Sequence, residues 1–190
     1  MLKRSEYRQV LYAACASLCA FLAACSGGAT KVDSDLGIKG APDWVNEGTQ
    51  SVSNKGGRLI QGVGSSPPLG DESLQISTAD NRARTEIARV VSTYLDVMGN
   101  DYMAATKQTE GYTADASIQQ QINSVSKVVL NGSKILGRWK HDETGVIYSF
   151  AELDLKKVQD IIKANQNMNE GLKVYLLDNS NVAFDKIAKE

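Results

Sequence analysis

The first 24 residues place the strongest limit on the fold, because their pattern predicts that they are cut off and do not belong to the folded domain. Three basic residues stand near the start, at Lys3, Arg4 and Arg8. A stretch without charge then runs from Gln9 to Thr30, and its apolar part, residues 10–24, is 15 residues long. A membrane-spanning helix needs about 20, whereas a basic start before a shorter apolar run is typical of a secretory signal peptide. We therefore expect residues 1–24 to be removed.

The end of this segment carries a more specific pattern. Its last residues and the one after it are Leu22, Ala23, Ala24 and Cys25. This order resembles the lipobox of bacterial lipoproteins, in which the cysteine thiol, a good nucleophile as a thiolate, receives a diacylglycerol before the signal peptidase cuts. The resemblance implies that Cys25 is the first mature residue and carries a diacylglycerol and an N-acyl chain such as palmitate. Two or more acyl chains anchor stably, since each buried methylene contributes about 0.8 kcal/mol.

Cleavage at this site would leave the mature chain without a usable thiol. Cys15 and Cys19 lie in the segment to be removed, and the lipid would block Cys25. Neither a disulfide, a catalytic cysteine nor a cysteine-ligated metal is then expected. The remaining 166 residues (190 less 24) are enough to bury roughly 70% of the unfolded surface in one core. Ser26 follows Cys25, where resembling proteins kept in the inner membrane have aspartate, so the resemblance implies the outer membrane, facing the periplasm.

Residues 25–40 are small, polar and glycine-containing, and we expect them to form a flexible tether. A tether of this length reaches at most about 50 Å and averages roughly 20 Å as a random coil. A folded domain is expected over residues 41–190, beginning near Trp44. We expect that tryptophan to anchor the start of the domain, the alternative being an exposed ring that stacks on a ligand.

The periodicity of the domain predicts an α+β fold. Arg58 to Gly64 reads as a strand, and a long helix capped by Asp71 or Ser73 should end at Gly99 and Asn100. Residues 101–115 have no clear period, and residues 118–129 fit a helix better than a strand. A hairpin is predicted from strands 133–140 and 146–155. Two further helices should follow, one capped by Asp154 and ending near Gly171, the other at the C-terminus over residues 182–187. The expected architecture is a small single domain in which two or three helices pack on a short antiparallel sheet.

The order of these motifs resembles the lipoprotein-twenty (Lpp-20) family of bacterial outer-membrane lipoproteins. The segments that carry the resemblance are Pro42–Val45, Gly62–Gly64, Ala79–Ala88, the Trp139–Tyr148 hairpin and Ala183–Asp185. The resemblance covers nearly all of residues 41–189. It implies a small α/β domain at the outer membrane and does not imply a catalytic residue, and some relatives serve the flagellar outer-membrane disk.

Residues that could carry catalysis are scarce. His141, the single histidine, falls in the hairpin turn, so histidine-based triads and zinc sites lack their parts. Gly62–Pro67 begins like a dinucleotide loop but has proline where the third glycine belongs, and Asn131–Lys134 lacks phosphate-loop spacing. The mature chain would carry 18 basic and 21 acidic side chains (21 less 3 and 22 less 1), a net charge of −3, which disfavours nucleic acid as a partner. We expect neither an enzyme nor a cofactor nor a metal.

A charged helix face formed by Arg82, Arg84 and Arg89 is the candidate partner-binding surface. Its alternative is an ordinary solvated face, in which Arg82 and Glu86 pair at the i,i+4 spacing. These features favour a structural or protein-interaction lipoprotein of the cell envelope. The alternatives are an activator of a cell-wall synthase, which a short tether disfavours, and a binder of a small envelope ligand.

Overall fold

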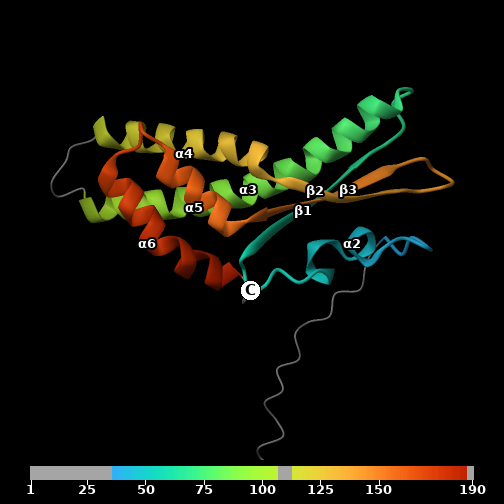
Figure 1. Ribbon diagram of the computed structural model, residues 1–190, viewed down its shortest axis with the longest axis horizontal. Coiled ribbons are helices and arrows are strands. Elements are labelled where there is room, and N and C mark those ends of the chain that lie inside the picture. The colour runs from blue at the N-terminus through green and yellow to red at the C-terminus, as the bar shows by residue number, and fades with distance from the viewer. Residues whose placement is uncertain (1–35, 107–112, 188–190) are drawn as a thin grey trace, which may run out of the picture. The chain divides into compact units, whose positions relative to one another are not determined.

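The computed structural model describes residues 36–106 and 113–187, which all fall within one compact unit. Helices and a three-stranded antiparallel sheet make up this unit, which confirms the α+β class (Figure 1). Four of its helices have ten or more residues, rather than the two or three helices expected. The predicted signal peptide, the lipobox and residues 25–35 of the predicted tether lie outside the described residues.

The sheet has the order β1-β3-β2, so β3 (Ile147–Asp154) lies between β1 (Leu59–Ser66) and β2 (Lys134–Lys140). The predicted hairpin is therefore confirmed, and the predicted first strand continues two residues further than expected. A bulge between Ile135 and Gly137 shifts the hairpin register. Ile135 lies opposite Ala151, as strict alternation predicts, but beyond the bulge Trp139 lies opposite Tyr148. The residues of β2 beyond the bulge thus point to the opposite face of the sheet from the one that simple alternation predicts.

The long helix α3 (Glu72–Thr106) begins after Asp71, whose Oδ1 accepts a hydrogen bond from the backbone N–H of Leu74 at 3.1 Å. Its buried apolar residues recur at three- and four-residue steps: Ala79, Ala83, Ile87, Val91, Leu95 and Met98. The first half of α3 lies across one face of the sheet (Figure 1). It can approach β1 closely because Gly62 and Gly64 have no side chains there, and a Cβ on either would collide with the Ala83 backbone.

The prediction that Gly99 and Asn100 end this helix is wrong. α3 continues to Thr106, so part of the undecided segment 101–115 is helical, and residues 107–112 lie outside the described residues. Gly99 is buried, and a Cβ there would collide with Cδ1 of Ile122 in α4. The glycine therefore allows two helices to approach, and their packing outweighs its helix-propensity cost of about 1 kcal/mol.

α4 (Thr113–Gly132) is helical throughout, which decides between helix and strand for residues 118–129. α5 (Leu155–Ala164) begins as predicted, with Asp154 Oδ1 accepting the Lys156 N–H at 2.8 Å. The predicted role of Gly171 is wrong, because α5 ends at Ala164 and Gly171 lies in the first turn of α6 (Glu170–Ile187). A Cβ on Gly171 would lie 2.5 Å from the Tyr102 hydroxyl, so the glycine makes room for α3.

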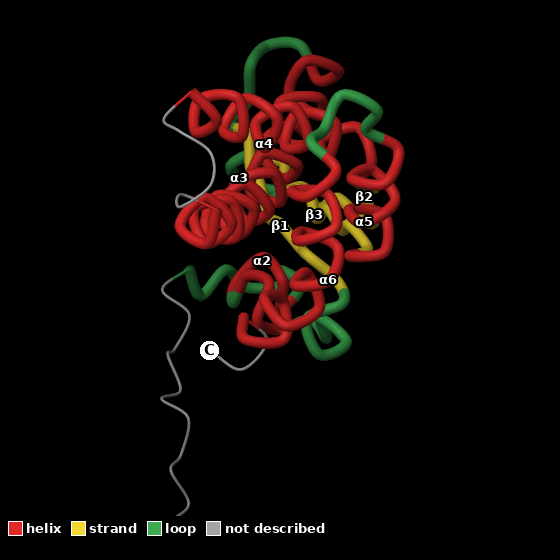
Figure 2. The backbone as a smooth tube through the Cα atoms, turned by 90° about the vertical axis from the view of Figure 1, so that its left-hand side faces the viewer, coloured by secondary structure: helices red, strands yellow, loops and turns green. Residues whose placement is uncertain are grey.

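The four long helices form one group (Figure 2). α3 contacts α4 and α6, and α5 contacts the same two helices. They enclose an apolar core whose largest fully buried side chains include Leu95, Ile122, Ile162, Leu176 and Phe184. The hairpin extends beyond this group along the first half of α3 (Figure 1).

Two short helices, α2 (Asp43–Asn46) and η1 (Gly48–Ser51), precede the sheet in the chain. Trp44 packs against Phe150 of β3 with ring centroids 5.7 Å apart, and Val45 is buried. Trp44 thus anchors the beginning of the described chain, as predicted, rather than standing free for a ligand.

Candidate functional site

The three candidate arginines all belong to α3, but the helix divides them between two sides. Successive residues of an α-helix are about 100° apart, which places Arg82 and Arg89 about 20° apart and Arg84 on nearly the opposite side. Arg82 and Arg89 are exposed and lie on the β1 side, while half-buried Arg84 lies beside Leu130 at the end of α4. The structure therefore does not bring the predicted triple face together.

Arg82 and Arg89 are each held by a local contact. Arg82 Nη1 donates to the Ser65 carbonyl oxygen of β1 at 2.6 Å. Arg89 forms an ion pair with Glu86, with Nη2 2.9 Å from Oε2. Glu86 therefore pairs at the i,i+3 spacing with Arg89, not at i,i+4 with Arg82. Because Arg82 binds a carbonyl at the outer edge of β1, it helps to block further strand pairing there.

An ion pair between a buried carboxylate and a half-exposed arginine joins the hairpin to α3, two residues before Arg82. Arg138 of β2 donates two hydrogen bonds to Asp80, from Nε at 2.8 Å and from Nη2 at 2.6 Å. Ser149 of β3, which is fully buried, donates to Asp80 Oδ1 at 2.7 Å. Asp80 itself is only 7% exposed. Three elements thus converge on one carboxylate, and the β2 bulge is what places Arg138 on the side of the sheet that faces α3.

The electrostatics of this carboxylate follow from its partners. The hydrogen bonds from Arg138 lower the pKa of Asp80 below its ordinary value, burial opposes this, and the Ser149 hydroxyl lowers the pKa further. The charge of Arg84 adds a smaller lowering effect. Asp80 is consequently ionised at neutral pH with its oxygens occupied, an arrangement suited to fixing the hairpin and not to transferring protons.

Three further polar contacts, made by Gln75 and by the pair of Lys140 and Glu72, lie at the same end of the hairpin. Buried Gln75 of α3 donates to the Ser66 carbonyl at 3.1 Å and to the Gly145 carbonyl at 2.7 Å. Lys140 of β2 forms an ion pair with Glu72 at 2.8 Å. The polar contacts of Gln75, Asp80, Arg138 and Ser149, which we call the hairpin clamp, were missed in the sequence. Their only signal was a carboxylate, Asp80, placed beside Ala79 and Ala83 on the buried stripe of α3.

The other residues that the sequence suggested for catalysis or phosphate binding lie in a turn, in a strand and at a helix end. His141 lies in the hairpin turn, where its Nδ1 accepts the N–H groups of Glu143 at 3.1 Å and Thr144 at 3.3 Å. Its ring meets Trp139 edge-on, at 5.6 Å between centroids. Gly62 and Gly64 lie within β1 against α3, and Asn131 is the residue before the last of α4, close to the start of β2.

Two grooves mark the surface near the sheet. One, of about 570 Å³, lies between residues 49–54 and β1, and its apolar wall includes Ile60, Val90 and Phe184. Gln61 also lines this groove and donates to Ser53 O at 3.1 Å and to Glu152 Oε2 at 3.2 Å. The other, of about 470 Å³, lies where the turn before β1, the start of β2 and the first turn of α5 meet.

Comparisons and general searches add little to this geometry. Neither a scan against protein-family models nor a search of curated proteins finds a match for the chain. In residues 36–106 and 113–187, no three or more His, Cys, Asp or Glu side chains are grouped so that they could hold a metal ion. No helix in the described part of the chain is long and apolar enough to cross a membrane.

Proposed function

We propose that the protein is a lipoprotein anchored in the outer membrane by Cys25, facing the periplasm, with a non-enzymatic, structural or protein-interaction role in the cell envelope. The observation that carries this proposal is the sequence Leu22–Cys25 at the end of a short apolar run. Acyl chains on Cys25 would hold the protein at the membrane surface. A tether over residues 25–40 would reach at most about 50 Å when fully extended, so it would keep the folded unit near the membrane.

The partner-binding surface we propose is the side of α3 that carries Arg82 and Arg89. Both side chains are exposed and flank the β1 edge, where Arg82 contacts Ser65. Charged residues at the rim of an interface steer association more than they stabilise the fold. The resemblance to the lipoprotein-twenty family favours an assembled structure, such as the flagellar outer-membrane disk, as the setting.

Membrane fractionation tests the anchor. Wild type should enter the outer-membrane fraction and incorporate labelled palmitate, whereas Cys25→Ala should remain uncleaved or appear in the soluble fraction. Cys19→Ala is the matched control, because it removes another cysteine six residues away and should leave processing unchanged. Palmitate incorporation by Cys25→Ala at the wild-type level would refute the proposal.

Crosslinking in intact cells tests the partner surface. The double variant Arg82→Glu/Arg89→Glu should lose the crosslinked partners of the wild type while keeping its thermal stability. Arg84→Glu is the matched control, since it reverses one arginine on the other side of the same helix. An unchanged crosslinking pattern in the double variant, or equal loss in the control, would exclude this surface.

A further inference from the structure

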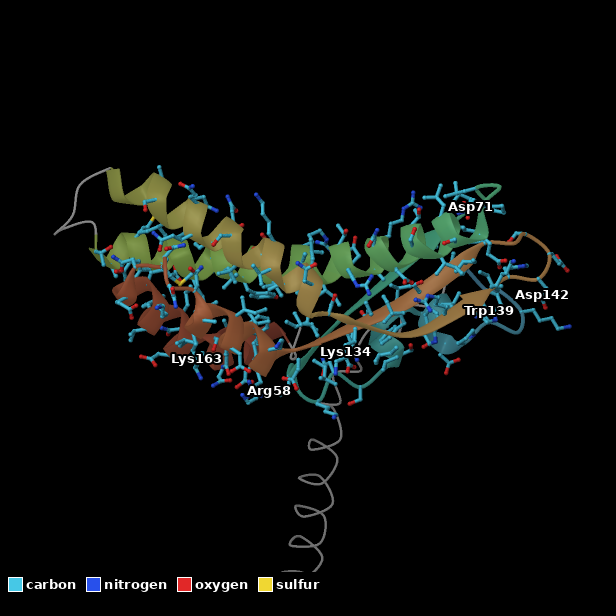
Figure 3. The ribbon with its side chains drawn as sticks, turned by 45° about the horizontal axis from the view of Figure 1, so that its top comes forward. Arg58, Asp71, Lys134, Trp139, Asp142 and Lys163 are labelled. Atoms are coloured by element: carbon cyan, nitrogen blue, oxygen red, sulfur yellow. The ribbon has the colours of Figure 1, made fainter. Side chains whose placement is uncertain are left out.

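The groove of about 470 Å³ is lined by an unusual share of lysines for a chain whose mature form would carry a net charge of −3. Four lysines line this groove, which we call the basic groove: Lys55, Lys134, Lys156 and Lys157. They come from three elements, namely the turn before β1, the first residue of β2 and the first turn of α5. In Figure 3, Lys134 lies on the same side of the unit as Arg58 and Lys163, away from Asp71 and Asp142.

Most of this positive charge has no carboxylate partner. Lys156 pairs with Asp160 at 3.3 Å, but Lys55, Lys134 and Lys157 form no ion pair with any residue that the structure describes. Three carboxylates also line the groove, and each accepts a hydrogen bond from a group other than Lys55, Lys134 and Lys157. Asp160 accepts from Lys156, Asp154 caps α5, and Glu152 accepts from Gln61.

Lys134 and Lys157, two of the three unpaired lysines, line the groove from separate elements. Lys134 lies opposite Glu152 in the β2–β3 register, yet Glu152 accepts from Gln61 instead. The stem of Lys157 packs near Gly132, where a Cβ would lie 3.5 Å from Lys157 Cγ, and Gly132 is two residues before Lys134. Two exposed lysines from separate elements therefore line one hollow without a carboxylate partner among the described residues.

We propose that the basic groove binds a phosphoryl group, with Lys134 and Lys157 as its main partners and Lys55 at its rim. A compact anion with more than one negative charge is attracted by the three lysines that have no carboxylate partner. Lysine is a common phosphate binder that acts as a point charge, and lysines supply all the cationic side chains that line the groove. The phosphoryl group can come from a lipid headgroup or from a soluble phosphate, and the experiment distinguishes these sources.

Lysine reactivity in the intact mature protein tests the proposal. The protein in neutral detergent is treated with an amine-acylating reagent, and the rate at each lysine is followed by mass spectrometry. Inorganic phosphate, compared with chloride at equal ionic strength, is the first probe. Vesicles of phosphatidylcholine with and without phosphatidic acid, carrying the protein, are the second. Lys127 of α4 and Lys39, which do not line the groove, are the internal controls.

We expect the acylation rates of Lys134 and Lys157 to fall at least threefold with one or both probes, while the two control lysines change less than 1.5-fold. A fall with free phosphate alone assigns a soluble ligand, and a fall with phosphatidic acid alone assigns a headgroup. Rates at Lys134 and Lys157 that stay unchanged with both probes, or that fall equally at Lys127, would overturn the proposal.

A charge-reversal pair adds a second readout. Lys134→Glu should abolish the protection of Lys157, whereas Lys127→Glu should preserve it. Full protection of Lys157 in Lys134→Glu would contradict a shared site. The phosphate arm does not require a lipid on Cys25, so a failure of the groove and a failure of the proposed membrane anchor give different results.

Discussion

The two halves of α3 are held by different kinds of contact. The second half, around Leu95 and Met98, packs against α4 and α6 through apolar side chains. The first half lies on β1 and the hairpin, where glycines, a buried carboxylate and the hairpin clamp make the contacts. One continuous helix thus joins two ends of the folded unit. Apolar burial stabilises the helical end, and specific polar contacts stabilise the hairpin end.

This difference has consequences for how each end responds to change. Apolar packing tolerates small shifts of side chains and does not depend on pH, whereas a buried ion pair fails when either partner is lost. The hairpin end also carries Arg82 and the start of the proposed partner surface. We therefore expect conditions or substitutions to alter that end while the helical end remains folded.

The largest effect should come from placing a charge in the helical core. Leu95 is fully buried, so Leu95→Asp would bury a carboxylate without a partner and destabilise the protein by more than about 4 kcal/mol. Val97, two residues along the same helix, is 53% exposed, and Val97→Asp should change the free energy of unfolding by less than about 1 kcal/mol. Urea unfolding followed by circular dichroism measures both. Similar free energies of unfolding in the two variants would contradict the conclusion that apolar burial stabilises the helical end.

The same substitution at a glycine of each end sharpens the comparison. At Gly64, a Cβ would meet fixed backbone, including Ala79 O and Arg82 C at 2.7 Å each, so Gly64→Ala should cost roughly 3 kcal/mol. At Gly99, the obstacle is the flexible end of Ile122, and alanine gains about 1 kcal/mol of helix propensity. Gly99→Ala should therefore be nearly neutral. A lower Tm for Gly99→Ala than for Gly64→Ala would contradict this difference between the two glycines.

Much of this architecture could be predicted from local patterns, and the exceptions share a cause. The period of Ile87, Val91 and Leu95, the caps at Asp71 and Asp154 and the pairing of β2 with β3 as a hairpin are set by neighbouring residues, and all were predicted. Gly99 and Gly171 were misassigned as helix ends, because their contacts, Ile122 and Tyr102, come from other helices.

The hairpin clamp was missed for the same reason. Asp80 and Arg138 are 58 residues apart, and their meeting depends on a bulge that the alternation of β2 does not reveal. For the candidate arginines, helix geometry alone separates Arg84 from Arg82, but the bond from Arg82 to Ser65 required the packing of α3 on β1.

Removing the arginine of the clamp should have a moderate effect. Arg138→Met leaves the Asp80 carboxylate largely buried with Ser149 as its remaining donor, so we expect a loss of about 2–4 kcal/mol, less than for a fully buried pair because Arg138 is half-exposed. Lys140→Met removes the neighbouring exposed pair with Glu72 and should cost no more than about 1 kcal/mol. Equal losses of unfolding free energy in the two variants would show that the hairpin clamp stabilises the fold no more than an exposed ion pair does.

The pH dependence should be the subtlest difference between the two ends. The pKa of Asp80 is lower in the folded chain than in the unfolded chain, so its stabilisation is complete above the unfolded pKa and is lost as pH falls through the folded pKa. Hydrogen exchange should show hairpin amides losing protection before those of α4 and α6 as the medium is acidified below about pH 4. In Arg138→Met the pH-dependent stabilisation by Asp80 should be smaller. Hairpin amides that lose protection at the same pH in wild type and variant would contradict the role of the Asp80–Arg138 pair.

The central functional claim is that the folded unit is tethered to a membrane through Cys25. The most direct measurement is the mass and sequence of the N-terminal peptide of the mature protein purified from membranes. We predict that this peptide begins at Cys25 and carries the added mass of a diacylglycerol and one further acyl chain. A mature chain that begins at another residue, or that begins at Cys25 without added acyl mass, would contradict the claim.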